Sequence, residues 1–164
     1  MKFVSIIMGS KSDYDVVINT AKELEKFDVK YELIISSAHR SPERTHEYVK
    51  VAEAKGAQVF IAAAGMAAHL AGSIAANTTR PVIGIPMGGS ALSGVDALYS
   101  TVQMPGGMPV ATVAIGKAGA INAAYLAMQI LALNDSELDA KLRADRVAKA
   151  EGVVSDSASI EVIL

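Results

Sequence analysis

The architecture of this chain is set by Phe3-Val-Ser-Ile-Ile-Met8 and the Gly9-Ser-Lys-Ser-Asp13 that follows it. The first segment is a short apolar run rich in β-branched residues, which predicts a buried strand. The second is a turn of glycine and hydroxyl residues. It leads into a helical spacing of apolar side chains at Tyr14, Val17, Ile18, Ala21 and Leu24. Strand, turn and helix in this order predict the first unit of a parallel sheet covered by helices.

The same alternation continues along the chain. Further strands are predicted at 31–35, 59–63, 82–85 and 110–115, and helices at 42–55, within 64–77, and at 94–102, 118–133 and 136–150. Helix boundaries are read from Ser12, Ser41-Pro42 and Ser136 as start signals and from Gly56 as a stop. The prediction is an α/β fold, a flavodoxin-like three-layer sandwich with a central parallel sheet and a C-terminal helical extension.

The domain organisation follows from the length and from the apolar helix at 118–133. With 164 residues, the chain is predicted to form a single catalytic domain, with a 1–133 core and a helix and tail at 134–164. The 118–133 segment is apolar nearly all round, so it needs cover on more than one side. We expect a homo-oligomer in which 134–164 pack on a neighbouring subunit; the alternative is a monomer with an ordinary apolar core.

Composition excludes several classes of protein. Hydrophobic residues make up 51% and charged residues 20%, which is typical of a folded domain. The net charge is −2, from 15 basic and 17 acidic residues without long single-sign blocks, so no nucleic-acid partner is expected. There is no cysteine, and we find no signal peptide or membrane-spanning run. A cytoplasmic location is expected.

The candidate site residues come directly after strands, where ligands bind in open parallel sheets. The first strand is followed by Gly9, Ser10, Ser12 and Asp13, a turn suited to an anion, although a plain capped helix start is an equal alternative. The second is followed by Ser37, Ala38, His39 and Arg40, which offer a proton carrier and a phosphate ligand unless they are an ordinary surface loop.

Two more loops complete the candidate set. The third strand leads into Ala64, Gly65, Met66, His69 and Leu70, where His69 either faces a ligand or is a structural histidine. The fourth leads to Ser90, Ala91 and Leu92 in a flexible glycine and serine loop. No dinucleotide, Walker, HExxH or GxSxG pattern is present, so no cofactor, metal or hydrolase triad is predicted.

Taken together, several motifs resemble the class I N5-carboxyaminoimidazole ribonucleotide mutase family. They are Met8-Gly-Ser-Lys-Ser-Asp13, Ser37-Ala-His-Arg40, Ala67-Ala-His-Leu70, Ala91-Leu-Ser-Gly-Val-Asp96, Leu98-Tyr-Ser100, Val102-Gln-Met-Pro105 and Ala114-Ile-Gly-Lys-Ala-Gly119. The likeness runs from Phe3 to about Leu133. Arg40 favours this class over the related carboxylases that use carbon dioxide directly, which resemble Ala-His-Lys at that point.

The resemblance implies a site and a reaction. Ser10, Ser12 and Arg40 would hold the phosphate, Asp13 the ribose hydroxyls, and His39 would be the acid and base. The loops at 64–70 and 90–92 would wall the imidazole and carboxylate. The resemblance also implies an octamer whose sites lie at subunit junctions. The reaction would move a carboxylate from N5 to C4 of the ribonucleotide, in purine synthesis, through decarboxylation and recarboxylation.

Some residues depart from the family pattern, which usually has Gly where Met66 stands and Pro where Ala71 stands. Gly106 replaces an Arg of some members, and the 87–89 segment is less polar than usual. These changes affect the expected loop shape but not the predicted catalytic position. Three rival functions remain open at this stage: a direct carboxylase, a flavin-binding electron carrier and a non-catalytic nucleotide-binding module.

Overall fold

The computed structural model describes residues 1–163 and contains one parallel sheet of five strands. The strands are β1 (Phe3–Met8), β2 (Tyr31–Ile35), β3 (Ala57–Ala64), β4 (Val82–Pro86) and β5 (Ala111–Thr112). Their order is β2-β1-β3-β4-β5, and every pair is parallel. The chain therefore winds in both directions from β1 and β3, which confirms the flavodoxin-like prediction.

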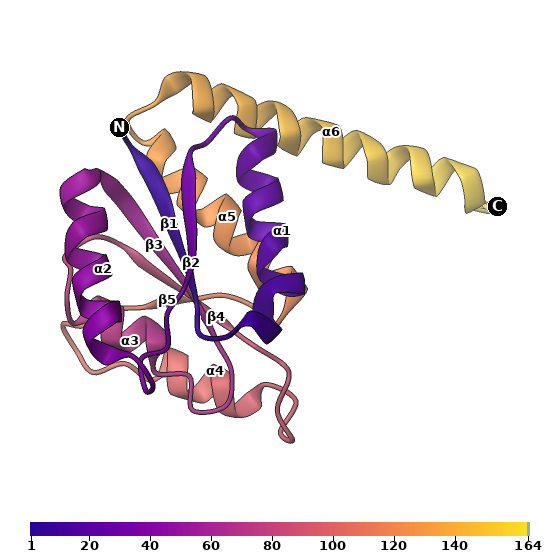
Figure 1. Cartoon of the computed structure of the whole chain (residues 1–164). Helices are drawn as coiled ribbons and strands as arrows, with labels where there is room; N and C mark the ends of the chain where they lie inside the picture. Colours follow the sequence, from indigo (N-terminus) through magenta and orange to yellow (C-terminus); the bar gives the residue numbers. More distant parts are fainter. Residues whose placement is uncertain (164) are drawn as a thin grey trace. The chain divides into compact units, whose positions relative to one another are not determined.

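Helices cover both faces of the sheet, as Figure 1 shows. The helices of the described residues are α1 (Tyr14–Lys26), α2 (Pro42–Lys55), α3 (Leu70–Ala75), α4 (Val95–Val102), α5 (Lys117–Ala132) and α6 (Ser136–Ile160), with a 3₁₀ turn η1 (Lys11–Asp13). On one face α1 packs against α5: Thr20 Oγ1 donates to Ala120 O at 2.8 Å, and the Phe27 and Tyr125 rings meet edge to face. The opposite face carries α2 and α3.

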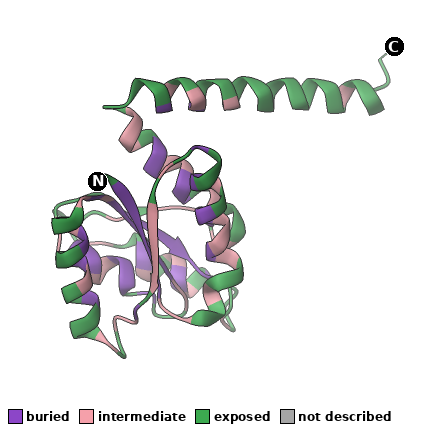
Figure 2. Cartoon of the chain, turned by 45° about the horizontal axis from the view of Figure 1, so that its top comes forward, coloured by how far each residue is buried: buried purple, intermediate pink, exposed green. Residues whose placement is uncertain are grey.

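The core between the sheet and α2–α3 follows the pleat of the strands. Phe3, Ile7 and Phe60 point into it and meet Val49 of α2 and Ile74 of α3. Figure 2 shows how continuously β1 and β3 are buried. This burial fixes the strand ends firmly, so the loops that follow them have a rigid base.

One polar group inside this core is fully satisfied. Ser5, midway along β1, is completely buried, and its hydroxyl pairs with Tyr48 Oη of α2 at 2.9 Å. Tyr48 also donates to Glu32 on β2. Burial raises the pKa of the Tyr48 phenol to about 12, so the group stays protonated and can serve as a donor.

Several predicted boundaries differ from the structure. Ser12 does not cap α1: Ser10 caps the preceding 3₁₀ turn, and its side chain accepts from the Ser12 N–H. Asp135, not Ser136, caps α6 through Leu138 N at 3.0 Å. Strand β5 has two residues rather than six, while α6 continues to Ile160, ten residues past the predicted end. Gly56 ends α2 in the left-handed conformation, as predicted.

The chain divides into two compact units at Met128 and Gln129, and the second contains the end of α5 and all of α6. Ion pairs at i,i+4 spacing, such as Arg143 with Asp139 at 2.8 Å, support the first half of α6. Its later turns expose Val147, Val153, Val154 and Ile160. Within residues 1–163, no helix combines the length and hydropathy that crossing a membrane requires.

Candidate active site

A pocket of about 660 Å³ opens at the carboxyl ends of the strands, next to the β1/β3 switch point. This is where doubly wound sheets bind ligands, and the volume suits a small metabolite. Its walls come from the loops that follow four different strands. The lining residues are Gly9, Ser10, Ser12, Asp13, Ser37, Ala38, His39, Arg40, Ala64, Gly65, Met66, Ala67, His69, Leu70, Met87 and Gly89.

The turn after β1 presents hydroxyl and amide groups at one side of the pocket. Gly9 N donates to Ala63 O at 3.0 Å, which ties the turn to β3. The Ser10 hydroxyl accepts from Ser12 N at 3.3 Å and from Ser12 Oγ at 3.0 Å. The turn is thus held in shape by its own side chains, and its small residues leave the pocket side open for an anion.

Asp13 closes the same turn with a half-buried carboxyl group. Burial raises the pKa of Asp13 above its ordinary value, and a backbone hydrogen bond from Ser10 opposes this in part. An ionised carboxylate here is therefore poorly hydrated. The charged form of Asp13 is stabilised when a ligand supplies hydroxyl donors in place of the lost water.

This burial predicts that Asp13→Asn is more stable than the wild type at neutral pH. Because the folded-state pKa is raised, the folded protein binds more protons than the unfolded chain, so unfolding free energy falls as pH rises above the unfolded value of 3.8. Asparagine does not ionise, so its advantage should vanish below that pH. Thermal unfolding across pH measures this, with the exposed Asp15→Asn as control; a less stable Asp13→Asn at neutral pH would contradict it.

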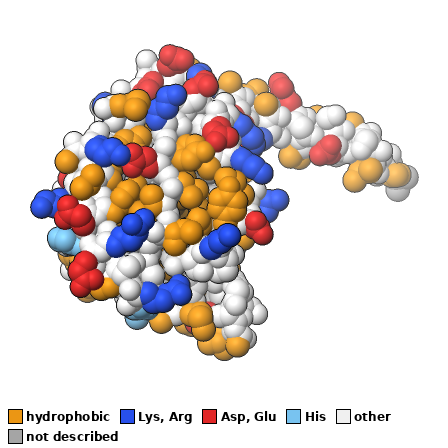
Figure 3. Space-filling view, viewed as in Figure 1, with side chains coloured by type: hydrophobic (Ala, Val, Ile, Leu, Met, Phe, Trp, Pro, Cys, Tyr) orange, Lys and Arg blue, Asp and Glu red, His pale blue; other side chains and the backbone are white. Residues whose placement is uncertain are grey.

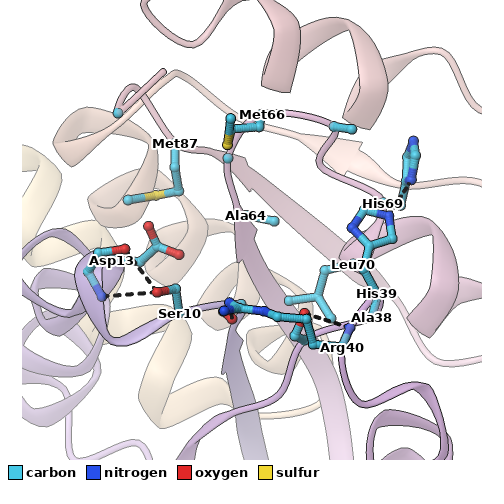
Figure 4. Close-up of a pocket in the computed structure, with 16 residues that line it drawn as sticks. Ser10, Asp13, Ala38, His39, Arg40, Ala64, Met66, His69, Leu70 and Met87 are labelled. Carbon is cyan, nitrogen blue, oxygen red and sulfur yellow. Dashed lines mark hydrogen bonds between the residues drawn. The ribbon is translucent and has the colours of Figure 1, made fainter. Parts of the chain in front are cut away.

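The turn after β2 brings a guanidinium group to the β1 turn. Ser37 anchors it: its hydroxyl accepts from Arg40 N at 3.1 Å, and its carbonyl accepts from Ser41 N at 2.8 Å. Arg40 Nη2 then donates to Gly9 O at 3.4 Å. Figure 4 shows the Arg40 side chain extending across the pocket floor toward Ser10. Ser10, Ser12 and Arg40 therefore converge from two neighbouring strands.

The opposite side of the pocket carries two imidazoles. His39 Nε2 lies 2.7 Å from His69 Nδ1, and the ring planes are nearly perpendicular, at 87°. His39 follows β2 and His69 follows β3, so the sheet order brings together residues thirty positions apart. The third histidine, His46, is exposed on α2 and hydrogen-bonded to Asn77.

The loop after β3 is held in an unusual conformation. Met66 has a φ of 56°, in the left-handed region, and its side chain is 67% exposed. Ser100 of α4 holds the loop by accepting from Ala68 N at 2.9 Å, while its hydroxyl donates to Asp96 O of its own helix at 2.6 Å. Glycine adopts this backbone without strain, whereas the Cβ of Met66 makes the same conformation unfavourable.

The structure brings nearly all the predicted site residues into this one pocket, but not the 90–92 segment. The Ser90 hydroxyl donates to Asp96 Oδ1 at 2.7 Å and accepts from Leu92 N and Gly94 N, so it stabilises the start of α4. Ala91 and Leu92 are exposed. The neighbouring Gly89 lines the pocket instead, as does the buried Met87, which directly follows β4 and was missed as a site residue.

A turn of hydroxyl and amide groups, a bridging arginine and paired imidazoles give this doubly wound α/β protein a polar pocket at the switch point, suited to a small anionic ligand. Sequence comparison makes the assignment specific. The chain belongs to the AIR carboxylase family, which it matches over residues 3–152.

Individual relatives agree with the family. The chain is 51% identical over 153 residues to an N5-carboxyaminoimidazole ribonucleotide mutase of Escherichia coli (strain K12), covering 93% of this chain and 90% of the relative. It is 56% identical over 140 residues to the mutase of Pyrococcus horikoshii, covering 85% and 78%. Among solved structures it is similar to Treponema denticola PurE, with a TM-score of 0.89, 29% identity, and coverage of 99% and 100%.

Proposed function

We propose that this chain converts N5-carboxyaminoimidazole ribonucleotide into the isomer carboxylated at C4, a step of purine synthesis. The observation that carries the proposal is that His39 and the anion-binding turn at Ser10 line the same pocket. A proton carrier and a phosphate site must share one cavity for this reaction. The mutase names of relatives near 50% identity over most of the chain support the same activity.

In this proposal the pocket holds the ribonucleotide by its two polar ends. Ser10, Ser12 and Arg40 bind the phosphate, since Arg offers paired donors to phosphate oxygens. Asp13 accepts from the ribose hydroxyls. The remaining wall around the imidazole ring and carboxylate comprises Gly9, Ser37, Ala38, Ala64, Gly65, Met66, His69 and Leu70. Ser90, Ala91 and Leu92, predicted for the same wall, directly follow Gly89 but do not line the pocket themselves.

The chemistry needs one group that first gives and then takes a proton. The bond between N5 and the carboxylate breaks, N5 gains a proton, and carbon dioxide is released inside the pocket. C4 attacks it to form the new carbon–carbon bond and then loses its own proton. His39 is proposed to serve both steps, since an imidazole exchanges protons readily near neutral pH. Atoms and electrons balance without a redox partner or nucleotide cofactor.

An ultraviolet assay tests the function and separates it from direct carboxylation. Purified protein is given N5-carboxyaminoimidazole ribonucleotide in one reaction, and aminoimidazole ribonucleotide with bicarbonate in another. We expect rapid formation of the C4-carboxylated product only in the first. Efficient turnover in the second alone would assign direct carboxylase activity. Binding without turnover in either would leave a nucleotide-binding module.

We further propose that the protein works as a cytoplasmic homo-oligomer, with an octamer as the expected state. Exposed apolar side chains support this. Val95, Tyr99 and Val102 lie three to four residues apart on α4, and Leu92 beside them is also exposed. Figure 3 shows further hydrophobic side chains grouped between charges of both signs on the face that includes β2. The segment 134–164 is proposed to pack on a neighbouring subunit.

A further inference from the structure

The contact between His39 and His69 fixes more than the position of two rings. At 2.7 Å between His39 Nε2 and His69 Nδ1, one nitrogen must carry a proton and the other must offer a lone pair. Two N–H groups facing each other would repel, and so would two lone pairs. The contact therefore constrains which nitrogen of each ring is protonated.

Both rings stand on backbone that is held in place from several sides. The His69 N–H donates to Ala67 O, and the His69 carbonyl accepts from Ser73 N, each at 2.9 Å. Ser100 fixes the preceding loop residues. His39 sits in the turn that Ser37 anchors. Because these hydrogen bonds hold the backbone of both residues, the contact between the two rings does not depend on a flexible segment.

The other ionisable side chains that line the pocket are Asp13 and Arg40. Arg40 has no acceptor atom, so it cannot take a hydrogen bond from an imidazole N–H. Figure 4 shows Asp13 with Ser10 on the side of the pocket away from the two histidines. His69 is therefore the acceptor that the described pocket places against His39.

We propose that His69 is a positioning residue whose Nδ1 accepts from His39 Nε2–H, so that His39 exchanges protons with substrate through Nδ1. This inference rests on the proposed function and refines it. It assigns to His69 the orienting role that an aspartate has beside the histidine of a catalytic triad. If His69 served only as part of the pocket wall, it would not need to accept a hydrogen bond from His39.

The proton balance follows directly. His39 begins protonated on both nitrogens, with Nε2–H bonded to His69. As the N5–carboxylate bond breaks, Nδ1 gives its proton to N5, which leaves neutral His39 with the remaining proton on Nε2. Nδ1 is then a lone pair, ready to take the proton that C4 loses once the carbon–carbon bond has formed. His39 ends protonated as it began, and His69 stays neutral throughout.

The tautomer of His39 can be measured on the full-length, ligand-free protein. With ¹⁵N-labelled histidine rings, only three residues contribute signals, and His46 is an internal reference away from the pocket. We expect neutral His39 to be the Nε2–H tautomer in the wild type and a tautomer mixture in His69→Phe. A neutral His39 protonated mainly on Nδ1 in the wild type, or an unchanged tautomer in His69→Phe, would overturn the inference.

Kinetics with three variants provide a second readout. Asn at position 69 keeps an acceptor near the place of Nδ1, whereas Phe keeps the ring without an acceptor. We expect His69→Phe to lower kcat at least ~10-fold with little change in KM, within the range of acid–base effects. His69→Asn should recover much of this loss, and His46→Phe should match the wild type.

Equal losses in His69→Asn and His69→Phe would assign His69 a packing role and refute the proposed positioning. The two experiments also separate this inference from the proposed function. A wild-type protein without mutase turnover would refute the function, while the ring spectra still decide whether His69 fixes the tautomer of His39.

Discussion

His39→Asn is expected to lower kcat by at least ~10²-fold, and up to ~10⁴-fold, while the dissociation constant for the ribonucleotide changes little. Asparagine is polar and smaller than histidine, but it neither gives nor takes a proton near neutral pH. The phosphate and ribose contacts proposed for Ser10, Arg40 and Asp13 lie across the pocket and remain. Binding measured by calorimetry, together with turnover measured in the ultraviolet, separates the two effects.

The matched control for this experiment is His46→Asn. His46 is also an exposed histidine with a side-chain hydrogen bond, at 2.6 Å to Asn77, but it does not line the pocket. Its replacement should leave kcat and binding at wild-type values. Near-normal turnover in His39→Asn would remove His39 from the mechanism and require another proton carrier.

The sequence predicted the sheet well because its strands are buried apolar runs. The β1 run is followed at once by glycine and a helical pattern, and few other assignments of secondary structure fit this order. Strand β5 shows where this signal fails. The run at 110–115 has the composition of a strand, yet only Ala111 and Thr112 pair, with Ile83 and Gly84 of β4. Composition reports the tendency to extend, and pairing depends on where the neighbouring strand ends.

Cap residues were harder to predict than elements. Ser12, the predicted cap of α1, lies inside the 3₁₀ turn Lys11–Asp13, and Ser10 caps that turn two positions earlier. At the other end of the chain, α6 was predicted to end at residue 150, two residues before Gly152. The α6 helix passes through it, because glycine inside a helix costs only ~1 kcal/mol and i,i+4 ion pairs support the turns before it.

The candidate site was predictable to the extent that it follows strand ends. His39, Arg40, Asp13 and Ser10 were all found by that rule. The rule does not say which loop residues turn inward, so Met87 was missed and Ser90 was included, although Ser90 is engaged at the start of α4. The contact between His39 and His69 could not be predicted either, since it depends on the relative height of the loops that follow β2 and β3, which lie on either side of β1.

Arg40→Ala is expected to raise KM on the order of 10- to 100-fold, because a hydrogen bond to a charged group contributes ~1.5–3 kcal/mol. In the ligand-free protein, Arg40 donates to Gly9 O at 3.4 Å, near the long limit for a hydrogen bond. Replacing that weak bond with a phosphate contact costs little, so most of the new interaction should appear as affinity. The KM of Arg40→Lys should lie between those of the wild type and Arg40→Ala, since an ammonium group keeps the charge but not the paired geometry.

Arg44→Ala is the control for Arg40→Ala, because Arg44 is also exposed and also donates to a backbone carbonyl, Ile35 O at 3.3 Å, but does not line the pocket. Steady-state kinetics of the three variants should show kcat within a few-fold of the wild type, because Arg40 is proposed to bind the substrate at a distance from the reacting atoms. A KM for Arg40→Ala equal to that of Arg44→Ala would mean that the phosphate binds elsewhere. The turn at Ser10 would then hold the anion alone, through its hydroxyls and backbone N–H groups.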